Sequence, residues 1–128
     1  MLGIPAALRA DAEIEAEYAG DGSPVRLSVE GGELRGGAAG FVYFPLPLGR
    51  WYEDLIFTWA NILLFRSEEI DGWCEGDSAP RGEALTLTWE LSKAWYGDRL
   101  SPGYRDRTAE EVERVFGSLG LTRAFWRP

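Results

Sequence analysis

The stretch Ala12-Glu-Ile-Glu-Ala-Glu-Tyr18 alternates apolar and acidic side chains. A period of two is typical of a β-strand with one face against a core and the other in water. The turn-rich segment Gly20-Asp-Gly-Ser-Pro24 follows, and the alternation resumes from Val25 to Val29. The two runs predict a β-hairpin, so the fold is expected to be built around a sheet.

Further segments extend this pattern. Gly31-Gly32 turns the chain into a short Glu33–Arg35 strand, and the aromatic, β-branched run Phe41–Phe44 predicts another strand that ends at Pro45. The apolar-rich stretch Leu55–Phe65 fits either a buried strand or the buried face of a helix.

Helical patterns lie at both ends of the chain and after the apolar stretch. Pro5 to Arg9 is consistent with one short turn, and Ser67, followed by two glutamates, predicts the cap of a short helix through Cys74. Thr86 or Thr88 is the expected cap of a longer helix that Gly97 stops. Its expected apolar stripe comprises Leu87, Leu91, Ala94 and Trp95.

The last helix has the clearest boundaries. Thr108-Ala-Glu-Glu111 is a capping box, and Gly120 is the expected C-terminal glycine. Phe125 and Trp126 are expected to pack back onto the core. The apolar stripe of this helix comprises Val112, Val115, Phe116 and Leu119.

Strands precede most of the helices, which predicts the α+β class: a small, mostly antiparallel sheet flanked by helices. We expect residues 1–128 to form a single domain, a length that buries roughly two-thirds of the unfolded surface.

Composition limits the chemistry. The chain has no histidine and one cysteine, but six tryptophans, five tyrosines and six phenylalanines. Serine–histidine and cysteine–histidine catalysis and ordinary zinc sites are therefore excluded. We expect neither a metal nor a cofactor, and any reaction would depend on carboxylate, tyrosine, lysine or arginine side chains.

Charge limits the partners. The net charge is −8 and the isoelectric point about 4.5, which argues against nucleic acid and anionic membranes. No apolar run approaches the roughly 20 residues of a membrane span, and the first residues lack the pattern of a signal peptide. We expect a cytoplasmic protein with a small-molecule ligand, and homo-oligomerisation is left open.

Candidate polar site residues flank the apolar stretch. Glu53 and Asp54 are either a solvated pair or, if one faces an apolar pocket beside Trp51, a source of a general acid. Asn61 interrupts the apolar run, so its amide either satisfies local backbone or contacts a ligand.

Aromatic residues are concentrated in the same region. Tyr43, Trp51 and Trp59 are candidates to line a pocket for a flat apolar ligand, and Tyr43 also carries a hydroxyl suited to proton transfer. Core packing is the alternative for all three. Cys74 has no second cysteine or histidine to activate it, and we interpret it as a packing residue.

Several ordered segments resemble the core domain of the alkylmercury (organomercurial) lyase family, and together they span nearly the whole chain. They are Leu2–Leu8, Ser23–Val29, Phe57–Phe65, Phe65–Glu69 with Trp73-Cys74, Ala94–Pro102, Gly120–Thr122 and Phe125-Trp126. The resemblance implies a small sheet flanked by helices, with the family's reactive site near Trp59.

The resemblance does not extend to the reactive residues. In that family two cysteine thiolates and an aspartate act on mercury; the first cysteine and the aspartate directly precede the segment matched by Leu2–Leu8. The alignment places Trp59 at the second cysteine and Tyr18 at a further one. The family's N-terminal helical domain has no counterpart, so we expect a shortened, divergent member. Mercury prefers thiolate ligands, so organomercurial cleavage is not expected.

Three hypotheses follow. The first is a repurposed lyase-like protein that binds a small apolar or aromatic molecule and catalyses a non-thiol cyclisation, isomerisation or elimination, as in secondary metabolism. The second is a non-catalytic module that binds a small molecule or another subunit. The third is an inactive remnant or a fragment of a longer chain.

Overall fold

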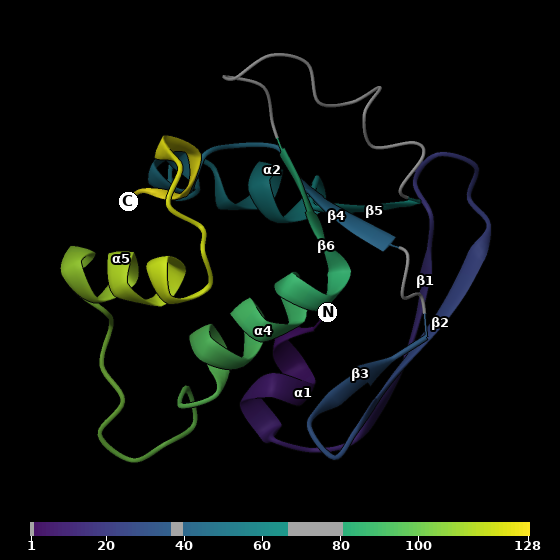
Figure 1. The fold of residues 1–128 in the computed structure, drawn as a ribbon, viewed down its shortest axis with the longest axis horizontal. Helices are drawn as coiled ribbons and strands as arrows, with labels where there is room; N and C mark the ends of the chain where they lie inside the picture. The colour runs from purple at the N-terminus through teal and green to yellow at the C-terminus, as the bar shows by residue number, and fades with distance from the viewer. Residues whose placement is uncertain (1, 37–39, 67–80) are drawn as a thin grey trace.

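The computed structural model describes residues 2–36, 40–66 and 81–128, and Figure 1 traces its fold. In these ranges the α-helices are α1 (Gly3–Leu8), α2 (Leu55–Ala60), α4 (Leu85–Tyr96) and α5 (Ala109–Ser118), with 3₁₀ turns η1 (Leu48–Arg50) and η2 (Ala124–Trp126). The strands are β1 (Ala12–Glu17), β2 (Pro24–Glu30), β3 (Glu33–Arg35), β4 (Gly40–Phe44), β5 (Leu63–Arg66) and β6 (Arg81–Ala84). The α+β class predicted from the sequence is confirmed.

These strands form two antiparallel three-stranded sheets, where the sequence had suggested one. The first sheet has the order β1-β2-β3, and the second has β4 between β5 and β6. The backbone N–H of Ala19 donates to the Leu64 carbonyl at 2.8 Å and links the sheets where β1 ends beside β5. Despite this bond, the described strands form two separate ladders rather than one continuous sheet.

The opening hairpin forms as predicted. Ile14 pairs with Leu27 across β1 and β2, and both side chains are buried, while the glutamates of β1 are exposed. This burial follows the period-two pattern, so the register is set by the apolar face.

The stretch from Leu55 to Phe65, for which the sequence allowed a helix or a strand, contains a helix followed by a strand. Asp54 caps α2 by accepting the Phe57 N–H at 2.9 Å, and β5 begins three residues after the helix ends. Within α2 it is Thr58 that is fully buried, and its hydroxyl lies 3.1 Å from the Trp51 carbonyl and 2.8 Å from that of Asp54. The helix is therefore anchored through a polar side chain.

Helix α4 lies at the centre of the molecule, with α1 packed against it (Figure 1). The prediction of a threonine cap is wrong, because the helix begins at Leu85 and Ala84 occupies the N-cap position. Continuity with β6 places Thr88 inside the helix, where its hydroxyl donates to the Ala84 carbonyl at 3.1 Å. The apolar stripe is also shifted: Trp89 is buried and Ala94 is exposed.

The predicted boundaries of α5 are confirmed. The Glu111 N–H donates to the Thr108 hydroxyl, and the Glu111 carboxylate accepts the Thr108 N–H, which completes the capping box. Gly120 has a φ of +77°, and the Leu121 N–H returns to the Phe116 carbonyl at 2.9 Å. This left-handed C-terminal arrangement favours glycine.

Trp126 is part of the hydrophobic core and is 1% exposed. Its ring contacts those of Phe44, Trp51, Phe116 and Phe125 at centroid distances of 4.9, 6.2, 5.6 and 4.9 Å. Its indole N–H donates to the Glu83 carboxylate at 3.1 Å. The prediction that the C-terminus packs back onto the core is confirmed, whereas the helix predicted from Ser67 to Cys74 lies outside the described residues.

Removing this side chain should be costly. Trp126→Ala should lower the free energy of unfolding by about 3–5 kcal/mol, because it leaves a cavity among four rings and an unpaired partner at Glu83. Urea unfolding measures the change. Tyr52→Ala is the control, because Tyr52 is 70% exposed and its loss should cost no more than about 0.5 kcal/mol. Equal losses in the two variants would contradict the central position of Trp126.

Candidate functional site

The described residues enclose a mainly apolar cavity of about 880 Å³. Helices α1, α4 and α5, the end of β1, strands β4 and β5, and the η1–α2 segment all contribute to it. Its apolar wall includes Leu2, Ile4, Ala7, Ala16, Val42, Phe44, Trp51, Trp59, Ile62, Leu63, Leu64, Leu91, Trp95 and Phe116. Segments far apart in the sequence therefore converge on a single cavity.

Aromatic rings form a connected part of this wall. The Trp51 ring lies 5.6 Å from that of Trp59 and is stacked against Phe44 at 5.8 Å. Phe116 and Trp95 meet edge to face at 5.9 Å. The indole N–H of Trp51 is already donated to the Leu46 carbonyl at 2.8 Å, so this indole presents an apolar surface.

Polar groups are few. Helix α4 contributes Thr88, Ser92 and Tyr96, whose spacing of four residues places them on one helix face. The Ser92 hydroxyl donates to the Thr88 carbonyl at 2.9 Å. Burial raises the pKa of the Tyr96 hydroxyl, and the nearby Arg99 guanidinium opposes this to a smaller extent, so the phenol is protonated at neutral pH. Glu17 is the one residue with a formal charge among the described residues of the wall.

The cavity opens between exposed apolar residues. Ile4 of α1 is 67% exposed and Trp59 of α2 is 46% exposed, although both line the cavity. The outer surface of α2 is also apolar, with Leu55, Ile56 and Phe57 exposed. An exposed apolar group of this kind is typical of an interaction or ligand-binding surface.

A charged cluster lies at the turn after β1, next to the cavity residues Tyr18 and Gly22. The Ser23 hydroxyl and N–H donate to Asp21 Oδ1 at 2.6 and 2.9 Å, and Arg66 Nη1 donates to Oδ2 at 2.8 Å. These bonds, those from Ser23 above all, lower the pKa of Asp21 from 3.8 to about 2. The Arg66 guanidinium also lies 4.4 Å from the ring centroid of Tyr18, which lines the cavity.

Two of the aromatic candidates line the cavity and one does not. Trp51 and Trp59 are part of its wall. Tyr43 is absent from it because neighbouring residues of β4 face opposite ways, and Val42 and Phe44 point to the cavity side. The Tyr43 ring instead meets Phe65 edge to face at 6.0 Å.

The polar candidates lie outside the wall. Glu53 is exposed and paired with Arg50 at 3.0 Å, and Asp54 is the exposed cap of α2. The Asn61 amide donates to the Phe57 carbonyl at 2.8 Å, so it satisfies local backbone, which was one of its two predicted roles.

Sequence reasoning missed the contributions of α1, Tyr18 and α4. Thr88, Ser92 and Tyr96 recur every four residues, a spacing that places them on one helix face, whereas the sequence analysis assigns Thr86 or Thr88 to the helix cap. Leu2 and Ile4 carry no local signal of this kind. They reach the cavity because α1 packs on α4.

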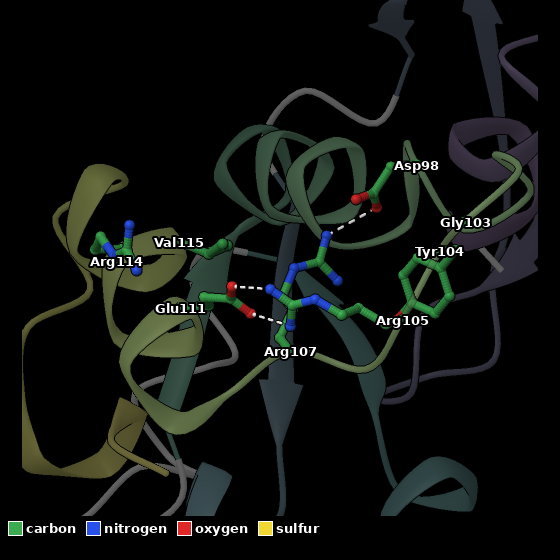
Figure 2. Close-up of a pocket in the computed structure, with 8 residues that line it drawn as sticks. All are labelled: Asp98, Gly103, Tyr104, Arg105, Arg107, Glu111, Arg114 and Val115. Atoms are coloured by element: carbon green, nitrogen blue, oxygen red, sulfur yellow. Dashed lines mark hydrogen bonds and ion pairs between the residues drawn. The ribbon is translucent and has the colours of Figure 1, made fainter.

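A second, smaller hollow of about 380 Å³ lies between the loop after α4 and helix α5 (Figure 2). Two of its arginines, Arg105 and Arg107, are bonded to other groups of the protein. Arg105 forms two bonds to the Glu111 carboxylate at 3.1 and 2.6 Å, which lower the Glu111 pKa to about 2. Arg107 donates to Asp98 at 2.9 Å and to the carbonyls of Trp95 and Ala94 at the end of α4. These contacts indicate a clamp between two helices.

None of the helices in residues 2–36, 40–66 and 81–128 has the length and apolar character needed to cross a bilayer. No protein-family model matches the chain, and no curated protein or solved structure gives a significant match. The resemblance to the alkylmercury lyases accordingly stays a prediction.

The Asp21 cluster should make stability depend on pH. The pKa of Asp21 is lower in the folded state, so as pH falls the unfolded state binds the proton first. Stability should decline from about pH 3.8 towards pH 2. Asp21→Asn should remove part of this decline and lower stability at pH 7, as measured by urea unfolding across the pH range. Glu13→Gln, at an exposed carboxylate of β1, is the control. An unchanged pH slope in Asp21→Asn would count against this role.

Proposed function

We propose that this protein binds a small, largely apolar molecule of aromatic character in the cavity between α1, α2 and α4. The observation that carries the proposal is the cavity itself. Its volume of about 880 Å³ falls within the roughly 300–1,000 Å³ typical of small-molecule sites. Its wall is mainly aliphatic and aromatic with a few convergent hydroxyls, which is also typical of such sites.

The shape of the opening supports the same proposal. Trp59 is half-exposed at the rim and its ring contacts the buried Trp51. A ligand that covers the exposed face of Trp59 would remove apolar surface from water at a point already continuous with the core. Ile4 provides a second apolar contact at the rim.

The resemblance to the alkylmercury lyases favours this location. Trp59 and Tyr18 stand where the alignment places cysteines of that family, and Leu2–Ile4 stands directly after the segment with its first cysteine and aspartate. All three positions line the cavity. The described wall contains no cysteine, and Cys74 lies outside the described residues, so the proposal includes no thiol chemistry.

A second candidate function is catalysis on the bound molecule by a lyase, isomerase or cyclase mechanism without metal or thiol. One observation favours it: the Tyr96 phenol lines the cavity, and burial raises its pKa further above neutral. A protonated hydroxyl against a bound molecule is suited to proton donation. Glu53 and Asp54 are not part of this second candidate function, because Glu53 is paired with Arg50 and Asp54 caps α2 outside the cavity wall.

Binding should depend on Trp59. With 2-naphthol as the probe, Trp59→Ala should weaken the affinity about tenfold by calorimetry, because the loss of one aromatic contact and its buried area is worth about 1.4 kcal/mol. Ile56→Ala is the matched control, since Ile56 is on the same helix, is 85% exposed and does not line the cavity. Equal affinities for all three proteins, or no binding by the wild type, would contradict the proposal.

Incubation of the protein with 2-naphthol, followed by analysis of the recovered probe, separates binding from catalysis. Mass spectrometry should recover the probe unchanged from a binding protein. A product formed by the wild type and lost in Tyr96→Phe would favour the second candidate.

A further inference from the structure

The cavity-facing side of α4 carries a row of hydroxyls in an otherwise apolar wall. Thr88 and Ser92 are four residues apart and both line the cavity. Ser92 is 9% exposed, and Thr88 is half-buried. A ligand that approaches this side of α4 would meet these two hydroxyls together with the Leu91, Trp95 and Tyr96 side chains, which also line the cavity.

The protons of both hydroxyls are already used. Thr88 Oγ1 donates to the Ala84 carbonyl at 3.1 Å, and Ser92 Oγ donates to the Thr88 carbonyl at 2.9 Å. A hydroxyl has one proton and two lone pairs. Each oxygen therefore keeps lone pairs that accept a hydrogen bond but has no proton left to donate.

The charges around the cavity also disfavour an anionic ligand. Glu17 is the charged residue of the described wall, and the chain carries a net charge of −8. Arg66, whose guanidinium lies over the ring of the cavity residue Tyr18, is paired with Asp21 at 2.8 Å. A ligand carboxylate would leave water for a mainly apolar wall that carries the Glu17 carboxylate, which is costly. The Tyr18 and Tyr96 phenols also line the cavity, but they offer a carboxylate neutral donors rather than a countercharge.

We propose that Thr88 and Ser92 form an acceptor ledge that favours, at this face of α4, apolar ligands bearing a hydroxyl or amine donor over ligands that only accept, and that the charges around the cavity disfavour carboxylates. This inference rests on the proposed function, because it assigns the ligand class of the same cavity. The ledge is a specificity-determining feature and takes no part in a chemical step.

Three naphthalene probes of similar size test the ledge. 2-Naphthol offers a donor, 2-methoxynaphthalene only accepts, and 2-naphthoate is an anion at neutral pH. Calorimetry with the wild-type protein should show 2-naphthol binding about threefold to tenfold more tightly than 2-methoxynaphthalene, the range expected for one neutral hydrogen bond. 2-Naphthoate should bind most weakly of the three.

Substitution locates the preference. In Thr88→Val/Ser92→Ala the two neutral probes should bind with equal affinity, and the affinity for 2-methoxynaphthalene should stay at its wild-type value. Ser118→Ala is the matched control: the Ser118 hydroxyl also donates to a carbonyl of its own helix, that of Val115 at 2.7 Å, but lies outside the cavity. Circular dichroism checks folding, and if the double variant does not fold, each single variant should reduce the preference.

The outcomes distinguish the two proposals. If both neutral probes bind in a Trp59-dependent manner with equal affinity, or if the preference for 2-naphthol survives in the ledge variants, the ledge is overturned and the binding function stands. If 2-naphthoate binds as tightly as 2-naphthol, the exclusion of carboxylates is overturned. If no probe binds the wild type, the proposed function and the ledge fail together.

Discussion

The packing of Trp126 is the interaction on which the rest of this structure depends. The last 3₁₀ turn, η2, brings its indole against rings from β4, the segment after η1, and α5, and its N–H reaches Glu83 on β6. Trp126 does not itself line the cavity, but Phe44, Trp51 and Phe116 do. Trp126 therefore packs against three rings of the cavity wall without lining the cavity itself. The positions of those rings depend on its packing.

The sequence predicted those parts of the fold whose determinants are close together along the chain. The hairpin of β1 and β2 follows from alternation, and the capping box of α5 involves residues three apart. Leu55–Phe65 could not be assigned in this way. Its division into α2 and β5 depends on the Asp54 cap, on Thr58 reaching the Trp51 carbonyl, and on β5 pairing with β4. The first two are local contacts, but periodicity does not reveal them, and the pairing of β5 with β4 joins residues at least 20 positions apart.

The residues of the candidate site likewise include some that the sequence predicts and some that it does not. Trp51 and Trp59 were found because large aromatic residues near an apolar run are good candidates for a pocket wall. Tyr43 was included by composition alone, and the alternation of β4 already placed it on the face opposite Val42 and Phe44. The place of Thr88 and Ser92 in the cavity wall could not be predicted in this way, because a threonine near the start of a helix resembles a cap. The continuous passage from β6 into α4 leaves no such role for it.

Helix α2 buries a polar side chain and presents its apolar and aromatic side chains to the surface. It buries Thr58 and exposes Leu55, Ile56 and Phe57, the reverse of an ordinary amphipathic helix. This inversion is possible because the Thr58 hydroxyl contacts two backbone carbonyls, so the helix is held without burying its apolar residues. The half-exposed Trp59 is left at the opening of a cavity whose described wall has one charged residue and no histidine or cysteine. If the proposed ligand binds there, its recognition would depend on the shape of the cavity, on the aromatic rings of the wall and on the hydrogen bonds that the hydroxyls of α4 can form.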